Sequence, residues 1–358
     1  MKPTQAKAPG KLYIAGEYAV VEPGHPSVIV AVDRFITVSV SPSKGTSGTI
    51  TSPSLSEKTL HWRRNGQRIR LEEPNEKADI LLKTMEVTEQ FLTEKGRPLP
   101  YYDLSIESSL DSADGRKYGL GSSGAVTVAA ADALLKSAGL SLTDDKLFKL
   151  AALVHVSLKS RGSLGDLAAA AYTGWINYSS PDKKWIELQL DQVTLASLID
   201  EPWPELDIQR LNAPASLKLL IGWTGQPAST ESYVTSVQQD MEKINYQTFL
   251  KKSKACVTDL ISGIRKDEPE QIKRSVRRNR ELLLKMSLAK DILLETPLLK
   301  DLNEIAEHHG AAAKTSGAGG GDCGLAFFEH AGQKEKISED WRTSNIEPLP
   351  LTVYDKHN

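Results

Sequence analysis

A glycine- and serine-rich segment directly ahead of a helical stretch narrows the choice of folds more than any other part of the sequence. Residues Gly119–Gly124 read GLGSSG, and Ala125–Ser137 has the composition of a strong helix. The first amide groups of a helix have no partner inside it, and the helix dipole is positive at that end. Glycine also lets the backbone approach an anion closely. The segment therefore indicates a phosphate-binding turn, with a tight turn capped by serine as the plain alternative.

The spacing of these glycines, G-x-G-x-x-G, is shared with dinucleotide-binding turns and with the glycine loop of protein kinases. A dinucleotide turn needs a strand that leads directly into the first glycine. Here the strand ends near Leu110 and a polar stretch follows, while Asp144 and Asp145 begin a helix instead of ending a second strand. The sequence also lacks V-A-I-K, H-R-D, D-F-G and G-x-x-x-x-G-K-S/T segments. The Rossmann, protein-kinase and P-loop interpretations are therefore disfavoured.

Length and composition set the broad class. A chain of 358 residues suggests two domains. Because its net charge is −2, the chain lacks the basic footprint of a nucleic-acid-binding protein. The two cysteines, Cys256 and Cys323, are far apart in the sequence, which favours a reducing cytoplasm over a disulfide scaffold. No apolar run approaches the ~18 residues of a membrane span, and glycines and charges interrupt the N-terminus where a signal peptide would be apolar. We expect a cytoplasmic enzyme with no nucleic-acid or membrane partner.

The first part of the chain has the pattern of a mixed strand and helix domain. Apolar density and alternation predict strands at 28–32, 37–41, 102–107, 174–178 and 185–190, and a hairpin within 43–76. Helices are predicted at Asp79–Glu94 with Asp79 as cap, at 125–137, at 143–159 with Thr143 as cap, and around 168–171. A cluster of prolines at 202, 204 and 214 then marks the expected domain boundary, which gives domains 1–212 and 213–358.

The second part predicts a smaller α+β sandwich. A buried strand is expected at 217–223, followed by a helical region at 231–289 that is broken near Pro269. Another helix is expected at 298–309, a strand at 323–328 and a last strand at 348–353. This β, α, α, β order fits a two-layer α+β unit.

Two further segments combine glycine with charged residues. The first, APGKLYIAGEYAVVEPG, spans Ala8–Gly24 and contains Lys11, although a lysine near the start of a strand is commonly just solvated. The second, KTSGAGGGDCG, spans Lys314–Gly324 and has more glycines than a plain turn needs. Because glycine is entropically costly in a folded chain, this run suggests close approach of the backbone to a ligand or to another loop.

Taken together and in this order, the three segments resemble the signature motifs of the GHMP kinases. Within that family the residues are similar to those of bacterial phosphomevalonate kinases, and GEY (Gly16–Tyr18) stands where mevalonate kinases show GEH. The resemblance implies an α+β fold of two domains, a ribosomal-S5-like N-terminal one and a ferredoxin-like C-terminal one, with the active site in the cleft between them. It also implies ATP and Mg²⁺, and phosphorylation of (R)-5-phosphomevalonate to 5-diphosphomevalonate in isoprenoid biosynthesis.

The resemblance assigns the nucleotide side to the GLGSSG segment. Ser123 would be the Mg²⁺ ligand. The glutamate that supplies a second ligand in related kinases would fall near His155, where this chain has no carboxylate. The residues expected to bind ATP are Lys117, Gly119, Leu120, Gly121, Ser122, Ser123 and Gly124.

On the acceptor side, the resemblance points to Lys11 and Asp166 as catalytic residues. A phosphate monoester has a second pKa of ~6, so it is already an anion at pH 7 and needs no base. We therefore expect Lys11 to bridge donor and acceptor, and Asp166 to orient Lys11, with a plain helix N-cap as the alternative for Asp166. The residues expected to bind the acceptor are Lys11, Lys117, Ser160, Ser163, Ser229, Arg280, Ser316, Gly317, Ala318 and Gly319.

Several alternatives stay open at this point. A mevalonate or homoserine kinase would act on a hydroxyl, a diphosphomevalonate decarboxylase would consume ATP and release CO₂, and a nucleotide-binding regulator would not turn over at all. Arg277, Arg278 and Arg280 lie on a polar helix, where arginines usually face solvent. The sequence leaves both a monomer and a homodimer open.

Overall fold

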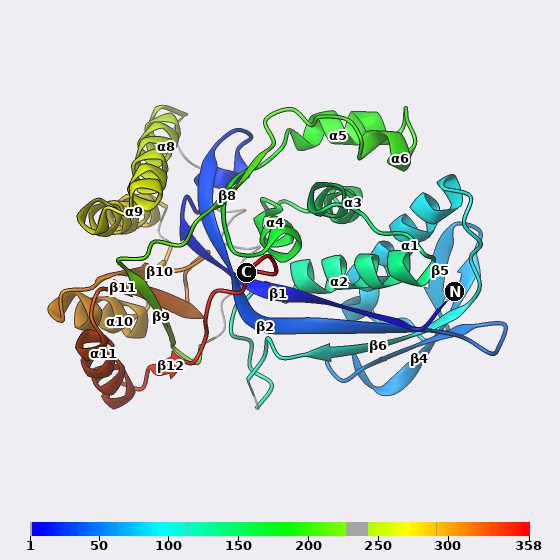
Figure 1. Ribbon diagram of the computed structural model, residues 1–358, viewed down its shortest axis with the longest axis horizontal. Coiled ribbons are helices and arrows are strands. Elements are labelled where there is room, and N and C mark those ends of the chain that lie inside the picture. The colour runs from blue at the N-terminus through cyan, green and yellow to red at the C-terminus, as the bar shows by residue number, and fades with distance from the viewer. Residues whose placement is uncertain (1, 113, 227–242, 291) are drawn as a thin grey trace.

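Two β-sheets and the helices packed on them make up the molecule (Figure 1). The structure is a computed structural model that describes residues 2–112, 114–226, 243–290 and 292–358. The α+β class expected from the sequence is confirmed. Among the described residues, no helix combines the length and the apolar character that crossing a membrane requires.

The first sheet is built from the N-terminal part of the chain. Its strands run in the order β5-β4-β3-β6-β2-β7-β8, with β1 paired to β2. All pairs are antiparallel except β3 with β6. The strands are β1 Thr4–Ala15, β2 Pro26–Pro42, β3 Gly48–Ser52, β4 Ser56–Asn65, β5 Arg68–Leu71, β6 Tyr102–Ser108, β7 Trp175–Ser179 and β8 Asp207–Leu211.

Helices cover one face of this sheet, seen above β1 and β2 in Figure 1. The central helix α2 has buried alanines at 125, 129, 130, 131 and 133, and these small side chains let it lie close to β1 and β2. The helices are α1 Asp79–Glu94, α2 Ser122–Ser137, α3 Asp144–Ser157, α4 Gly165–Tyr172, α5 Lys183–Leu190 and α6 Leu195–Leu198, with single turns η1 Ala19–Val21 and η2 Glu76–Ala78.

The second sheet is antiparallel and has the strand order β10-β11-β9-β12. Leu220, Leu302, Phe328 and Trp341 belong to the core between this sheet and helices α10 and α11. The other face contributes Trp223 and Phe327 to the larger core that continues into the first sheet. The elements are α8 Lys243–Lys266, α9 Pro269–Ala289, α10 Pro297–His308 and α11 Ala331–Thr343, with β9 Lys218–Trp223, β10 Ala312–Thr315, β11 Cys323–Phe328 and β12 Glu347–Leu349.

The C-terminal residues return to the first sheet. Val353 forms a bridge with Val32, and Tyr354 N donates to Ala31 O at 3.0 Å. The strand expected at 348–353 is therefore shorter, and the chain beyond it packs on β2 and β7 instead of the second sheet. The expected boundary at residue 212 falls between β8 and β9, and the division into two domains stays a prediction.

Most other expected elements are present, but several differ from the prediction. The stretch 185–190, predicted as a strand from its alternation, is wrong because it belongs to helix α5, whose N-cap Asp182 accepts from Lys184 N and Trp185 N at 3.0 and 3.2 Å. Helix α11 was not expected, and the 43–76 region holds the three strands β3, β4 and β5. Thr143 caps α3 as predicted, whereas Asp79 is the first residue of α1 and the N-cap is Ala78.

Candidate active site

The GLGSSG segment forms a turn that leads into α2. Gly121 is the N-cap of this 16-residue helix, with φ 79°, and Gly119 has φ 77°. Residues other than glycine rarely adopt these left-handed backbone angles, so the glycines allow the turn. Ser123 lies in the first helical turn and is exposed. The turn thus brings free helix amides and a hydroxyl to the surface together, which fits an anion.

Two charged side chains lie against the backbone of this turn. A Cβ atom added at Gly121 would be 3.0 Å from Lys11 Cε, and one added at Gly124 would be 2.6 Å from Asp166 Oδ2. Lys11 comes from β1 and Asp166 from the first turn of α4. The Ala8–Gly24 segment and the first turn of α4 therefore meet at the start of α2.

Lys11 is fixed to the turn by two bonds. Its backbone N donates to Leu120 O at 2.8 Å, and its Nζ donates to Gly119 O at 3.2 Å. Burial lowers the pKa of Lys11 below the usual lysine value, although Asp166 and Asp322 oppose this by favouring the charged form. The ammonium therefore lies at the GLGSSG turn, partly shielded from water and with carboxylates nearby.

Asp166 is not a helix cap. The N-cap of α4 is Leu164, which has φ 66° and makes no side-chain cap bond, and Asp166 is the second residue of the helix. A carboxylate in the first turn interacts favourably with the helix dipole. The plain alternative for Asp166, an N-cap, does not apply, and its side chain instead contacts Gly124.

The third glycine segment approaches the same turn. The carboxyl group of Asp322, just ahead of β11, occupies the space that a side chain at Gly119 would need. Asp322 has φ 57°, and Thr224 N donates to its carbonyl at 3.0 Å. The thiol of Cys323 donates to Tyr118 O at 3.1 Å, and burial raises its pKa, so it stays a protonated structural thiol.

Residues Ser316–Gly319 lie beside β1. Tyr13 N donates to Ser316 Oγ at 3.0 Å, and this hydroxyl donates back to Tyr13 O at 3.0 Å. Tyr18 donates its hydroxyl to Ala318 O. Gly317 and Gly319 have φ 77° and 75°, and Gly320 N donates to Leu294 O at 2.8 Å. The glycines thus allow a tight loop that is tied to β1 and to the segment before α10.

The Ser160–Ser163 loop, which the family resemblance assigns to the acceptor side, is held by side chains that we did not predict. Ser163 Oγ is 2.7 Å from Tyr13 Oη, and Tyr178 donates its hydroxyl to Ser163 O. Lys183 Nζ donates to Ser160 O at 3.3 Å and to Gly162 O at 2.8 Å. For Tyr13 a signal was available, because residues two apart on a strand share a face and Lys11 is its neighbour. Tyr178 and Lys183 carry no comparable sequence pattern.

A buried ion pair also escaped the sequence analysis. Lys314 and Glu17 are 1% and 3% exposed and form an ion pair. Asn279 Nδ2 donates to Glu17 Oε2 at 3.0 Å, and Gly16 N donates to Asn279 Oδ1 at 3.3 Å. The network joins the segment after β1 to β10 and α9. Removing one partner of such a pair typically costs about 3–5 kcal/mol, because it leaves a buried charge uncompensated.

Two predicted residues do not join this group, and a third cannot be placed. Lys117 is exposed, and its backbone forms an isolated antiparallel β-bridge with Asp111. Arg280 is engaged in a bidentate pair with Glu295, with N–O distances of 2.7 and 2.8 Å. Ser229 lies outside the described residues. Roles in acceptor binding for all three stay predictions.

The residues at the turn are compatible with Mg²⁺ carried by a nucleotide. The described part of the chain has no group of three or more His, Cys, Asp and Glu side chains that could hold a metal ion by themselves. Mg²⁺ typically keeps several waters and takes one or two protein ligands beside phosphate oxygens, and the exposed Ser123 hydroxyl at the start of α2 can be one of them. His155 Nε2 lies 3.3 Å from Thr127 Oγ1, and the Thr127 hydroxyl donates to Ser123 O at 2.9 Å.

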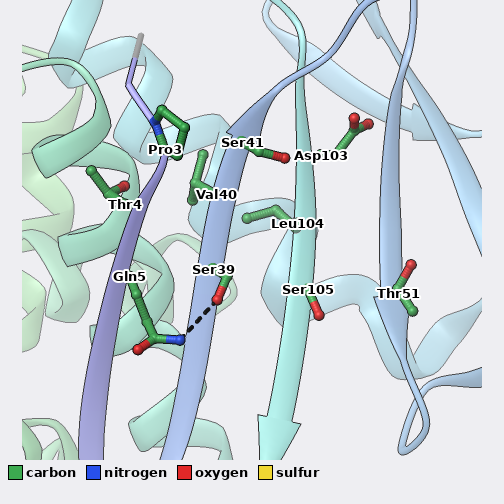
Figure 2. Close-up of a pocket in the computed structure, with 10 residues that line it drawn as sticks. All are labelled: Pro3, Thr4, Gln5, Ser39, Val40, Ser41, Thr51, Asp103, Leu104 and Ser105. Atoms are coloured by element: carbon green, nitrogen blue, oxygen red, sulfur yellow. Dashed lines mark hydrogen bonds between the residues drawn. The ribbon is translucent and has the colours of Figure 1, made fainter.

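A separate hollow of about 530 Å³ lies on the first sheet (Figure 2). It crosses β1, β2, β3 and β6 and is lined mostly by small polar side chains, with Gln5 Nε2 donating to Ser39 Oγ at 3.1 Å. Its one carboxylate among the lining residues, Asp103, already accepts from Thr49 N and Oγ1 at 3.0 and 2.8 Å. It contains none of the predicted site residues and no cation that would attract a phosphate.

The chain belongs to the GHMP kinase family. The family's N-terminal domain ("GHMP kinases N terminal domain") matches residues 80–174, and its C-terminal part ("GHMP kinases C terminal") matches residues 260–347. A phosphomevalonate kinase from Streptomyces sp. (strain CL190) is 37% identical over 96% of both chains. A mevalonate kinase from Thermococcus gammatolerans is 26% identical, over 90% of this chain and 88% of its own.

Solved structures agree with this assignment. A Lin0012 protein from Listeria innocua superposes with a TM-score of 0.91 and 36% identity, over 99% of this chain and 98% of its own. The Streptococcus pneumoniae phosphomevalonate kinase in complex with phosphomevalonate and AMPPNP superposes with a TM-score of 0.87 and 30% identity, over 98% of this chain and 99% of its own.

Proposed function

We propose that this chain transfers the γ-phosphoryl group of ATP to the phosphate of (R)-5-phosphomevalonate, giving ADP and 5-diphosphomevalonate. The observation that carries the proposal is the position of Lys11, whose ammonium lies on the GLGSSG turn and whose strand neighbour Tyr13 contacts the Ser160–Ser163 loop. One strand therefore connects a phosphate-binding turn to a second loop that presents hydroxyl groups. The similarity to phosphomevalonate kinases of two organisms supports the choice of acceptor.

In the proposed reaction, an oxygen of the acceptor phosphate attacks the γ-phosphorus, and the bond from that phosphorus to the β–γ bridging oxygen breaks. The electron pair of that bond leaves with ADP. The protein holds the two anions together and neutralises the charge of the transferring group. Lys11 provides the positive charge between them. Ser123 would hold a Mg²⁺ ion carried by the nucleotide, and that ion would offset charge on the nucleotide phosphates.

Asp166 acts on Lys11 in this proposal instead of accepting a proton. Its carboxylate favours the charged form of Lys11, which burial would otherwise disfavour. The acceptor phosphate is ionised at pH 7 and needs no base. A hydroxyl acceptor would need one, and the same position of Asp166 would suit that role, which is the structural observation that favours a mevalonate kinase as second candidate.

The test is ADP release with Mg²⁺-ATP and, in separate reactions, phosphomevalonate, mevalonate, diphosphomevalonate and homoserine. We expect turnover with phosphomevalonate only. Turnover with mevalonate or homoserine would replace the proposal and restore Asp166 as a candidate base. CO₂ release with diphosphomevalonate would identify a decarboxylase, and tight nucleotide binding with no turnover would identify a regulator.

A further inference from the structure

The Ser160–Ser163 loop has a cation beneath its backbone that the mechanism above does not use. Lys183 Nζ donates to the carbonyl oxygens of Ser160 and Gly162, at 3.3 and 2.8 Å. The loop lies between two residues in left-handed conformation, Lys159 with φ 55° and Leu164 with φ 66°. Such angles are unfavourable outside glycine and persist only where the surroundings impose them. Lys183 bonds to the carbonyls of the segment between these two residues.

Lys183 is itself placed firmly. It is the first residue of α5, and the Asp182 carboxylate caps that helix through Lys184 N and Trp185 N. In the described part of the chain, no ion pair joins Lys183 to a carboxylate, and its ammonium bonds to backbone carbonyls. Burial lowers the pKa of Lys183, while Glu187 and Glu22 oppose this through longer-range attraction. A partly buried ammonium is unfavourable unless hydrogen bonds satisfy it, and the carbonyls of the loop provide these bonds.

We propose that Lys183 is a positioning residue of the acceptor side: it holds the Ser160–Ser163 loop in the conformation that binds an anionic acceptor. The proposal rests on the proposed function and deepens it. Because Lys183 acts through loop carbonyls, its removal affects acceptor binding and leaves the nucleotide turn intact. The GLGSSG turn is held by Lys11 and Asp166 and makes no bond to Lys183 within the described residues.

The test compares Lys183→Met, Lys183→Arg and the control Lys184→Met with the wild-type enzyme. Lys184 follows Lys183 in the first turn of α5 and is exposed. Its substitution changes the net charge by the same amount as Lys183→Met but removes no contact with the loop. Losing charge-assisted hydrogen bonds should raise the KM for the acceptor by about 10–100-fold in Lys183→Met. The KM for ATP and kcat should change less than about threefold, Lys183→Arg should restore part of the loss, and Lys184→Met should behave as wild type.

Hydrogen exchange of the 158–164 segment provides a second measurement that does not depend on the acceptor. We expect faster exchange in Lys183→Met than in wild type, and wild-type exchange in Lys184→Met. An unchanged acceptor KM with unchanged exchange would overturn the proposal, and so would equal increases in both KM values with a lower Tm. If wild type uses another acceptor, the proposed function fails, and the Lys183 comparison is made with the acceptor that is turned over. If it uses none, the exchange measurement decides.

Discussion

The two loops of the site are held in different ways. The backbone of the Gly119–Gly124 turn is crowded, because a Cβ atom at Gly121 or Gly124 would be 3.0 or 2.6 Å from a charged side chain. The Ser160–Ser163 loop is open, because a Cβ atom at Gly162 would meet only Ser160 Oγ, at 3.6 Å. Side chains from distant parts of the chain contact both loops. The left-handed angles of the first loop come from its own glycines, whereas the second loop is held by Tyr13, Tyr178 and Lys183.

This difference has a functional meaning. The GLGSSG turn depends on a short glycine-rich segment that leaves little room for substitution. An acceptor loop supported from outside by Tyr13, Tyr178 and Lys183 can change its preference through substitutions elsewhere, while the nucleotide turn stays as it is. We therefore expect substitutions at the turn to affect kcat, and substitutions around the acceptor loop to affect the KM for the acceptor.

The largest effect should come from Lys11, which connects the two sides. We expect Lys11→Ala to lower kcat by about 10²–10³-fold, the loss that follows removal of one preorganised charge-stabilising group. The affinity for ATP should change much less, since the turn amides remain. Steady-state kinetics with phosphomevalonate and nucleotide binding by calorimetry measure both. An unchanged kcat would rule out the bridging role of Lys11.

Two controls sharpen the Lys11 prediction. Lys7→Ala removes an exposed lysine from the same strand and should leave kcat unchanged. Because burial lowers the pKa of Lys11 and the charged form is required, kcat/KM should fall as the pH rises, starting below the ordinary lysine value of 10.5. Lys11→Arg stays charged, so its remaining activity should lack this alkaline decrease.

A pair of glycine substitutions tests the contrast between the loops directly. Gly124→Ala would press a methyl group against Asp166 Oδ2, and we expect kcat to fall by about 10–100-fold through displacement of Asp166 and Lys11. Gly162→Ala meets no such contact and should leave kcat within about twofold. Kinetics measured well below the Tm of both variants separates this effect from loss of stability. Equal losses in the two variants would contradict the contrast.

The sequence was informative where a single segment determines its own structure. Helix α1 and strand β11 have the predicted bounds, Asp79–Glu94 and Cys323–Phe328, because periodicity and flanking residues define them locally. The GLGSSG turn likewise lies at the start of a helix, since its glycines allow the left-handed angles that the turn needs.

The sequence was less informative where partners meet only in the folded chain. The Glu17–Lys314 pair joins residues that are 297 positions apart, and no spacing rule connects them. The 185–190 stretch alternates like a strand, yet the Asp182 cap and the packing of α5 near α3 make it a helix. Lys183 lies at the start of that misassigned helix, so its contact with the acceptor loop could not be foreseen.

A smaller loss than in Lys11→Ala or Gly124→Ala should come from Asp166→Asn, which keeps the shape of the side chain and removes its charge. An acceptor phosphate that is already ionised needs no base, so we expect kcat to fall about tenfold or less, well below the loss in Lys11→Ala. Asp166 raises the pKa of Lys11, and burial lowers it. Without the carboxylate, the pKa of Lys11 falls further, and the alkaline decrease in kcat/KM should move to lower pH than in wild type. A loss as large as that of Lys11→Ala would mean that Asp166 takes part in proton transfer and does more than keep Lys11 charged. An unshifted alkaline decrease would mean that Asp166 does not set the pKa of Lys11, which would contradict its proposed role.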